Sequence, residues 1–142
     1  MPITTLEPTS SQRRLRIFAA IAALLSIAQV VVAVTMIVTN NSTVVLVHEG
    51  LGYLYAVAAV VTVFPARVWG RLSHDTGLIG HAAGMAVLGV AQLLLGLFYQ
   101  AAPGLIYVHM GLGLAIVLGS AALYVRANKK QIIVTEADAP GR

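Results

Sequence analysis

The stretch Leu105–Val125 reads LIYVHMGLGLAIVLGSAALYV and contains no charged residue. Three further stretches have the same character: Ile17–Val38, Val44–Phe64 and Leu78–Phe98. The length of each stretch is close to the ~20 residues that a helix needs to cross a ~30 Å hydrocarbon core. Glu49 is the one acidic or basic side chain in all four stretches. The sequence therefore predicts an all-α membrane protein, a bundle of four transmembrane helices.

The composition agrees with a membrane protein. Apolar residues make up 58% of the 142 positions and charged residues only 10%, against about 25% charged residues in soluble domains. These values exclude a water-soluble globule, a disordered chain and a nucleic-acid binder. The absence of cysteine excludes disulfides, thiolate metal sites and cysteine nucleophiles. We expect one bundle over residues 17–125, in contact with the lipid bilayer, between polar tails at 1–16 and 126–142.

Residues that interrupt helices fall between the apolar stretches. Asn40, Asn41 and Ser42 separate the first stretch from the second, and Pro65 is expected to end the second. Pro103-Gly104 predicts the turn between the third and fourth. The first stretch is too long for the apolar part of a cleaved signal peptide, so we expect it to remain as a helix.

The basic residues predict the orientation. The loops at 39–43 and 99–104 contain no lysine or arginine. All nine basic residues lie in the tails or in the middle loop: Arg13, Arg14, Arg16, Arg67, Arg71, Arg126, Lys129, Lys130 and Arg142. The positive-inside rule therefore predicts a multi-pass protein of the cell membrane with both termini cytoplasmic. Aromatic residues near the ends of the stretches are expected at the membrane interface: Trp69, Tyr99, Tyr107 and Tyr124.

Two short motifs occur twice, in the same order. Residues 28–33 read AQVVVA and residues 91–96 read AQLLLG. Residues 47–52 read VHEGLG and residues 108–113 read VHMGLG. This pattern predicts an internal repeat, in which each half of the bundle is one copy of a helical hairpin.

The repeat pairs two histidines, His48 and His109. If the halves are related by an axis along the membrane normal, the two side chains lie at equal depth, ~6 Å below the outer interface at ~1.5 Å per residue. Diagonal helices of a four-helix bundle can point such a pair at each other. A polar side chain inside a membrane is by default a candidate functional residue, although hydrogen bonding between helices is the alternative for each one alone.

The ligand that best fits such a pair is haem. Haem iron takes one neutral imidazole nitrogen on each face, and a flat macrocycle needs space between helices. Glycines beside each histidine remove side-chain bulk, and the second of each pair lies at i+4, on the histidine's face: Gly50, Gly52, Gly111 and Gly113. Zinc is less favoured because the other ligands of a four-coordinate site are missing at this depth.

Other polar residues have less certain roles. Gln29 and Gln92 lie about one turn deeper than the histidines, where they could hydrogen-bond the imidazoles, line the edge of a haem, or connect helices. His81 is expected near the cytoplasmic face, too far from the pair to be a third ligand. With His74 it could form a second site or a proton relay, but a solvated interfacial side chain is the favoured interpretation. The residues 80–84, GHAAG, also predict close helix packing or a dimer face.

The motif Gln92–Gly96, followed by Pro103 and by His109 with Gly111 and Gly113, resembles a helical hairpin of the haem A synthase family. Gln29 and His48 fit the preceding hairpin. Members of that family have eight spans in two four-helix bundles, each with a histidine pair on its second and fourth helices. Over residues 17–125 this chain resembles one such bundle.

The resemblance implies a b-type haem held by His48 and His109, with both as iron ligands. In the family, the catalytic bundle oxidises a methyl group of haem O to give haem A, and a glutamate four residues before its first histidine is important. Here that position is Val44, and Glu49 stands where an arginine often follows the histidine. The resemblance therefore implies the bundle that holds a cofactor, serving haem A biogenesis or electron transfer, while an oxidoreductase activity stays open.

Other functions fit the same sequence. A homodimer would restore the eight helices of the family. A non-enzymatic accessory or assembly subunit of a respiratory membrane complex is the main alternative. A small transporter is a weaker one, because the membrane interior offers almost no charge to couple to ions.

Overall fold

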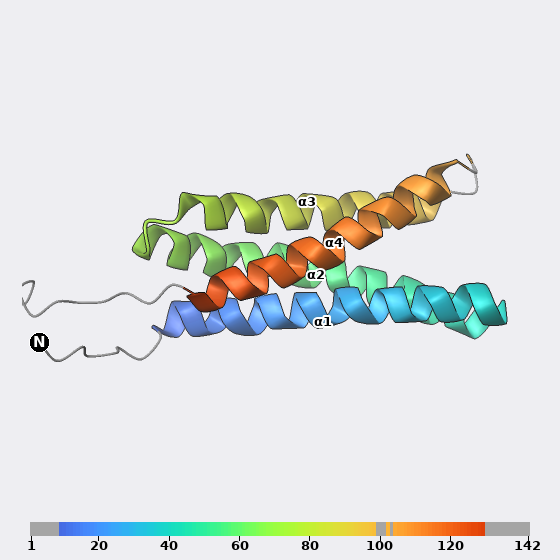
Figure 1. The fold of residues 1–142 in the computed structure, drawn as a ribbon, viewed down its shortest axis with the longest axis horizontal. Coiled ribbons are helices and arrows are strands. Elements are labelled where there is room, and N and C mark those ends of the chain that lie inside the picture. Colours follow the sequence, from blue (N-terminus) through green and yellow to red (C-terminus); the bar gives the residue numbers. More distant parts are fainter. Residues whose placement is uncertain (1–8, 99–101, 103, 130–142) are drawn as a thin grey trace, which may run out of the picture.

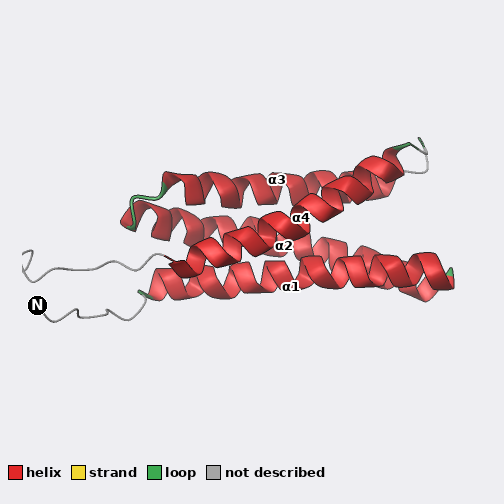
Figure 2. Ribbon diagram, viewed as in Figure 1, coloured by secondary structure: helices red, strands yellow, loops and turns green. Residues whose placement is uncertain are grey.

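The computed structural model describes residues 9–98, 102 and 104–129. They form four α-helices: α1 (Ser10–Thr39), α2 (Ser42–Leu72), α3 (Thr76–Phe98) and α4 (Leu105–Lys129). Figure 2 shows that these residues include no strand. All four helices are long and apolar enough to cross a membrane. The prediction of an all-α chain with four membrane-length helices is confirmed.

Parts of the predicted scheme fall outside the described residues. They include Tyr99, Pro103 and most of both polar tails. In the turn between α3 and α4, the structure describes only Ala102 and Gly104. Leu105 N donates to the main-chain oxygen of Ala102 over 2.9 Å, which closes a turn at the start of α4.

The Asn-Asn pair makes the first turn as predicted. Asn40 ends α1 in the left-handed conformation, with φ 47°, which asparagine adopts more readily than most residues. Asn41 then caps α2, because its side chain accepts from Thr43 N over 2.8 Å. Two residues are therefore enough to reverse the chain.

The prediction that Pro65 ends the second helix is wrong. Pro65 lies inside α2, which continues to Leu72. Proline removes one helical hydrogen bond, but the residues that follow it are packed in the bundle: Ala66, Trp69 and Gly70 are all buried. Packing of this last part of the helix outweighs the local preference of proline, as membrane bundles allow.

The helices form a ring. α1 packs against α2 and α4, and α3 packs against the same two helices. As a result α2 and α4 are diagonal to each other across the bundle. Figure 1 shows the four helices close together where α1 begins and α4 ends, with the two hairpins separating toward the opposite end.

Burial divides the bundle into two parts. In α1 the last buried residue is Ser26, and in α3 it is Gly89; in α2 the first is Tyr55, and in α4 it is Ile116. We call the tightly packed part, which contains these four residues, the closed half. The remainder, toward the turns at Asn40 and Gly104, is the open half.

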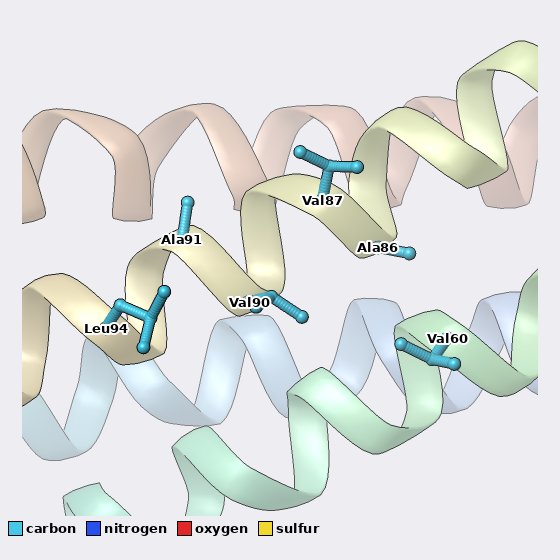
Figure 3. A pocket seen from close by; sticks show the side chains of 6 residues that line it. All are labelled: Val60, Ala86, Val87, Val90, Ala91 and Leu94. Atoms are coloured by element: carbon cyan, nitrogen blue, oxygen red, sulfur yellow. The ribbon is translucent and has the colours of Figure 1, made fainter.

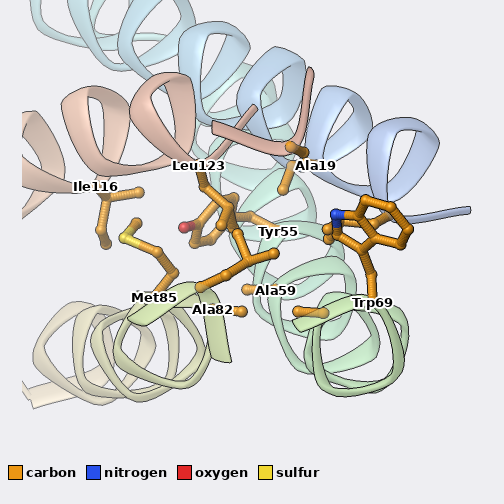
Figure 4. Close-up of a cluster of buried hydrophobic side chains, with 13 residues drawn as sticks. Ala19, Tyr55, Ala59, Trp69, Ala82, Met85, Ile116 and Leu123 are labelled. Atoms are coloured by element: carbon orange, nitrogen blue, oxygen red, sulfur yellow. The ribbon is translucent and has the colours of Figure 1, made fainter. Parts of the chain in front are cut away.

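The closed half is built around small residues. Ala19, Ala59 and Ala82 come from three different helices and are almost fully buried (Figure 4). Small side chains let helix backbones approach closely, which is the usual way membrane helices associate. Trp69 is 1% exposed and belongs to this core. The Trp69 ring therefore packs inside the bundle, whereas Tyr107 is 77% exposed; the position of either residue at the membrane interface stays a prediction.

One buried hydrogen bond connects the two diagonal helices. The hydroxyl groups of Tyr55 on α2 and Ser120 on α4 are 3.0 Å apart. Gly89 on α3 makes room for the tyrosine ring, because a Cβ there would lie 3.0 Å from Tyr55 Cε1. This contact fixes the spacing of α2 and α4 at the boundary between the closed and open halves.

The end of the closed half is fastened by polar contacts. Arg126 near the end of α4 forms an ion pair of 2.7 Å with Asp75, which also caps α3 by accepting from Leu78 N. Gln12 and Arg16 of α1 donate to main-chain oxygens in the last turn of α4, at Ala127 and Asn128. These donors satisfy carbonyls that a helix end leaves unpaired.

We expect Asp75→Asn to destabilise the bundle. The Asp75 side chain is 7% exposed and that of Arg126 is 40% exposed, so the ion pair is half-buried. Its loss should lower the free energy of unfolding by about 1–2 kcal/mol. Thermal unfolding in detergent measures it, with exposed Arg14→Ala as the control. An unfolding temperature equal to that of the parent would show that the ion pair does not fasten the bundle.

Candidate functional site

The two histidines paired by the sequence lie together in the open half. His48 on α2 and His109 on α4 face each other across the bundle, with ring centres 6.2 Å apart and ring planes inclined by 62°. Both rings are half-buried. Each histidine lies within two turns of the start of its helix, so the two diagonal helices present the rings at the same level.

The glutamines lie beside the histidines, one in each hairpin. Nε2 of Gln92 donates to the main-chain oxygen of His109 over 2.8 Å. In the other hairpin, Nε2 of Gln29 lies beside Gly52 of α2, where an added Cβ would be 2.9 Å away. Each glutamine side chain therefore lies against the histidine-bearing helix of its own hairpin, and Gln92 also hydrogen-bonds to it.

Several polar atoms of this cluster are buried without a hydrogen-bond partner. Nδ1 of both histidines is one such pair of atoms. Oε1 of both glutamines is also buried without a partner.

This concentration of unpartnered atoms is unusual. Buried polar atoms in native proteins are nearly always hydrogen-bonded, and exceptions call for an explanation. Among the residues that the structure describes, five buried side-chain atoms lack a partner; four are in this cluster and the fifth is Nε1 of Trp69, in the closed half. The cluster is therefore the outstanding candidate for a functional site.

The four glycines of the repeated motif have two different roles. A Cβ on Gly52 would lie 2.9 Å from Nε2 of Gln29, and one on Gly113 would lie 3.3 Å from Nε2 of Gln92. The space beside these two glycines thus admits the glutamine amides. Gly50 and Gly111 are exposed and would meet nothing within 4 Å, because residue i+2 lies on the far side of a helix from residue i.

One residue at the site was missed by the sequence reasoning. A Cβ on Gly96 of α3 would lie 3.3 Å from Cε1 of His109 and 3.8 Å from Nδ1. The missing side chain lets the imidazole lie against α3. The signal was present in the repeat, since both copies of the first motif end on a small residue, Ala33 and Gly96.

The other two histidines do not join the pair. Nε2 of His81 lies 3.0 Å from the main-chain oxygen of Gly119, so His81 connects α3 to α4 within the closed half. His74 lies in the turn before α3, with a positive φ of 52°, and does not share a helical face with His81. Among the described residues there is no group of three or more histidine, cysteine, aspartate or glutamate side chains that could hold a metal ion.

An open groove lies between α2 and α3 on the outside of the bundle (Figure 3). Its lining is entirely apolar: Val60, Ala86, Val87, Val90, Ala91 and Leu94. It offers no polar atom for catalysis or for orienting a ligand. The histidine cluster remains the candidate site.

Comparisons with known proteins add no assignment. The chain matches no protein-family model, no curated protein and no solved structure.

The glycines give a matched test of the site geometry. We expect Gly52→Ala to displace Gln29 and lower the thermal stability of the detergent-solubilised protein, and Gly113→Ala to have a smaller effect because its Cβ has more space. Gly50→Ala and Gly111→Ala should be neutral or stabilising by up to about 1 kcal/mol, since alanine favours helix. Equal effects at all four positions would contradict this packing.

Proposed function

We propose that this protein is a membrane cytochrome-like protein that binds b-type haem through His48 and His109. The observation that carries the proposal is the pair of half-buried imidazoles facing each other at a ring separation of 6.2 Å. The resemblance to one bundle of haem A synthase supports it.

The separation suits a metal between the two rings. A metal lies about 2 Å from an imidazole nitrogen, which is itself roughly 1 Å from the centre of its ring; two such distances on opposite sides of the metal give about 6 Å. The spacing of the two imidazoles therefore fits a metal that would be bound by one ring nitrogen of each histidine.

The open half is packed less tightly than the closed half. No residue of α2 before Tyr55 and none of α4 before Ile116 is buried. The closed half, in contrast, has no comparable space beside Met85 and Ile116, which are 5% and 4% exposed. This looser packing around the pair supports the proposal that a group binds between the helices there.

The ligand set favours electron transfer. A haem held by these two histidines would supply one-electron transfer and would leave no position open for O₂. Val44 stands where the resembled family has its catalytic glutamate, so this chain offers no matching group for oxidation of a haem methyl. The proposed role is therefore electron transfer, or holding a cofactor during haem A biogenesis.

The reduced-minus-oxidised absorption spectrum of the purified protein tests the proposal. We expect haem bands in the parent and their loss in His48→Ala, in His109→Ala and in the double variant. His74→Ala is the matched control, because it removes a histidine from a turn outside the site, and it should retain the bands. Haem retained in the double variant would reject the proposal.

The accessory-subunit alternative has its own test. Co-purification of this protein with a respiratory complex, without a haem of its own, would favour that alternative.

We also propose that both termini face the cytoplasm of the cell membrane. The support is the charge distribution: Arg67 and Arg71 lie at the closed end of the bundle together with the three arginines in the first two turns of α1, and Asn40 lies at the other end in a loop without basic residues. The cluster would then open toward the outer leaflet.

The natural absence of cysteine makes this orientation directly measurable. In intact cells, a membrane-impermeant maleimide should label Asn40→Cys but not Ser73→Cys, and lysis should make both reactive. The opposite pattern would reverse the assigned orientation.

A further inference from the structure

The apolar groove between α2 and α3 continues into a basic surface. Val60 of α2 lines the groove (Figure 3). Residues at i, i+4, i+7 and i+11 follow one face of an α-helix, and from Val60 these positions in α2 are Phe64, Arg67 and Arg71. All four side chains are exposed. The face of α2 that begins at the groove therefore ends in two arginines.

The neighbouring helix α3 leaves this path open. Gly70 packs against Ile79, since a Cβ on Gly70 would lie 2.6 Å from Ile79 Cγ1, so α2 and α3 are in contact at the level of the arginines. Between Ile79 and the groove residue Ala86, the exposed residues of α3 are Gly80 and Gly84. An added Cβ on either glycine would meet nothing within 4 Å. No bulky exposed side chain of α3 therefore separates the arginines from the groove.

The charges of the two arginines are not compensated. Within the part of the chain that the structure describes, neither Arg67 nor Arg71 forms a hydrogen bond or an ion pair through its side chain. Of the two carboxylates in that part, Glu49 lies in the open half and Asp75 pairs with Arg126. Two positive side chains four residues apart on a helix also repel each other. A negatively charged occupant would relieve this repulsion.

The length of the whole surface matches one leaflet of a bilayer. Ile79 of α3 is level with Gly70, which lies between the two arginines in the sequence, and Leu94 lines the far end of the groove. Ile79 and Leu94 are separated by ~22 Å along α3 at ~1.5 Å per residue. One leaflet, with its headgroups, is ~20 Å thick.

We propose that this surface binds one anionic phospholipid, with an acyl chain in the groove and the phosphate at Arg67 and Arg71. The groove alone suits any apolar chain and the arginines alone suit any anion, but only a molecule with both parts uses the whole surface. Guanidinium groups bind phosphate with paired hydrogen bonds, and basic sites between membrane helices are known to bind lipid headgroups. This site is separate from the histidine cluster and does not depend on haem.

Charge also argues against the other apolar occupant, a second copy of this chain. In a dimer formed on this face with both copies in the same orientation, Arg67 and Arg71 of one copy would lie near those of the other. Like charges brought together in this way oppose association. The phospholipid is therefore the favoured occupant.

Thermal unfolding of the purified full-length protein in neutral detergent tests the lipid chemistry. We expect dioleoyl phosphatidylglycerol to raise the unfolding temperature more than dioleoyl phosphatidylcholine, which has the same acyl chains but no net charge. Inorganic phosphate at the same concentration should not reproduce the shift, because it has no acyl chain. Equal shifts with the two lipids, or the full shift with phosphate alone, would overturn the proposal.

Two double variants test the arginines. Arg67→Gln with Arg71→Gln should weaken phosphatidylglycerol binding by roughly tenfold or more, as measured by lipid titration with native mass spectrometry. Arg13→Gln with Arg14→Gln is the matched control, because it removes two exposed positive charges from the same end of the bundle, on α1. Equal losses in both variants would show general attraction to anionic lipid and would overturn the site. Without lipid, the first variant should be as stable as the parent, since its arginines have no partner.

A bulky residue in the groove tests the place of the acyl chain. Val87 lines the groove and is 67% exposed, and Leu118 of α4 is 64% exposed outside it, so tryptophan at either position should leave the fold intact. Val87→Trp should weaken phosphatidylglycerol binding and Leu118→Trp should not. Unchanged binding in Val87→Trp would overturn the proposal. A dimer in lipid-free detergent that Val87→Trp dissociates would also overturn it, because a second copy would then cover the groove.

Discussion

The hydrogen bond between Tyr55 and Ser120 is the contact on which the geometry of the site depends. It joins α2 to α4, the two helices that are diagonal in the ring, at the boundary between the closed and open halves. His48 lies two turns along α2 from Tyr55, and His109 lies three turns along α4 from Ser120. Since a helix is stiff over such a length, fixing the diagonal distance at Tyr55 also limits the distance between the imidazoles.

The close packing of the closed half keeps Tyr55 and Ser120 in contact. Alanines bring the helices together, and the ion pair between Asp75 and Arg126 fastens α3 to α4 at the far end. This division explains how a short chain can combine close packing with an accessible cluster. The packed half supplies the stability, and the open half is free to present polar groups that would be costly in a tight apolar core.

Much of this arrangement could be predicted from the sequence because it follows from strong local signals. Four apolar stretches gave four membrane-length helices, and Asn40-Asn41 made the turn because asparagine suits both the left-handed conformation and the helix cap. The motif that occurs twice in the sequence led to the pairing of the two histidines, and their rings lie together.

What could not be predicted depends on contacts between helices. Pro65 does not end α2, because buried Trp69 holds the residues that follow it in the bundle. The same burial places the Trp69 ring inside the bundle. The space beside Gly52 and Gly113 admits glutamine amides, which only the packed hairpins reveal. His81 bonds a carbonyl of α4 that has no signature in the sequence.

We propose that His48 and His109, whose rings face each other in the structure, would together bind one haem iron. The electron paramagnetic resonance spectrum of the oxidised, haem-loaded protein tests this proposal. Two histidine ligands should give a low-spin ferric signal. A high-spin ferric signal would show that one of the histidines is not a ligand, and would contradict the proposal.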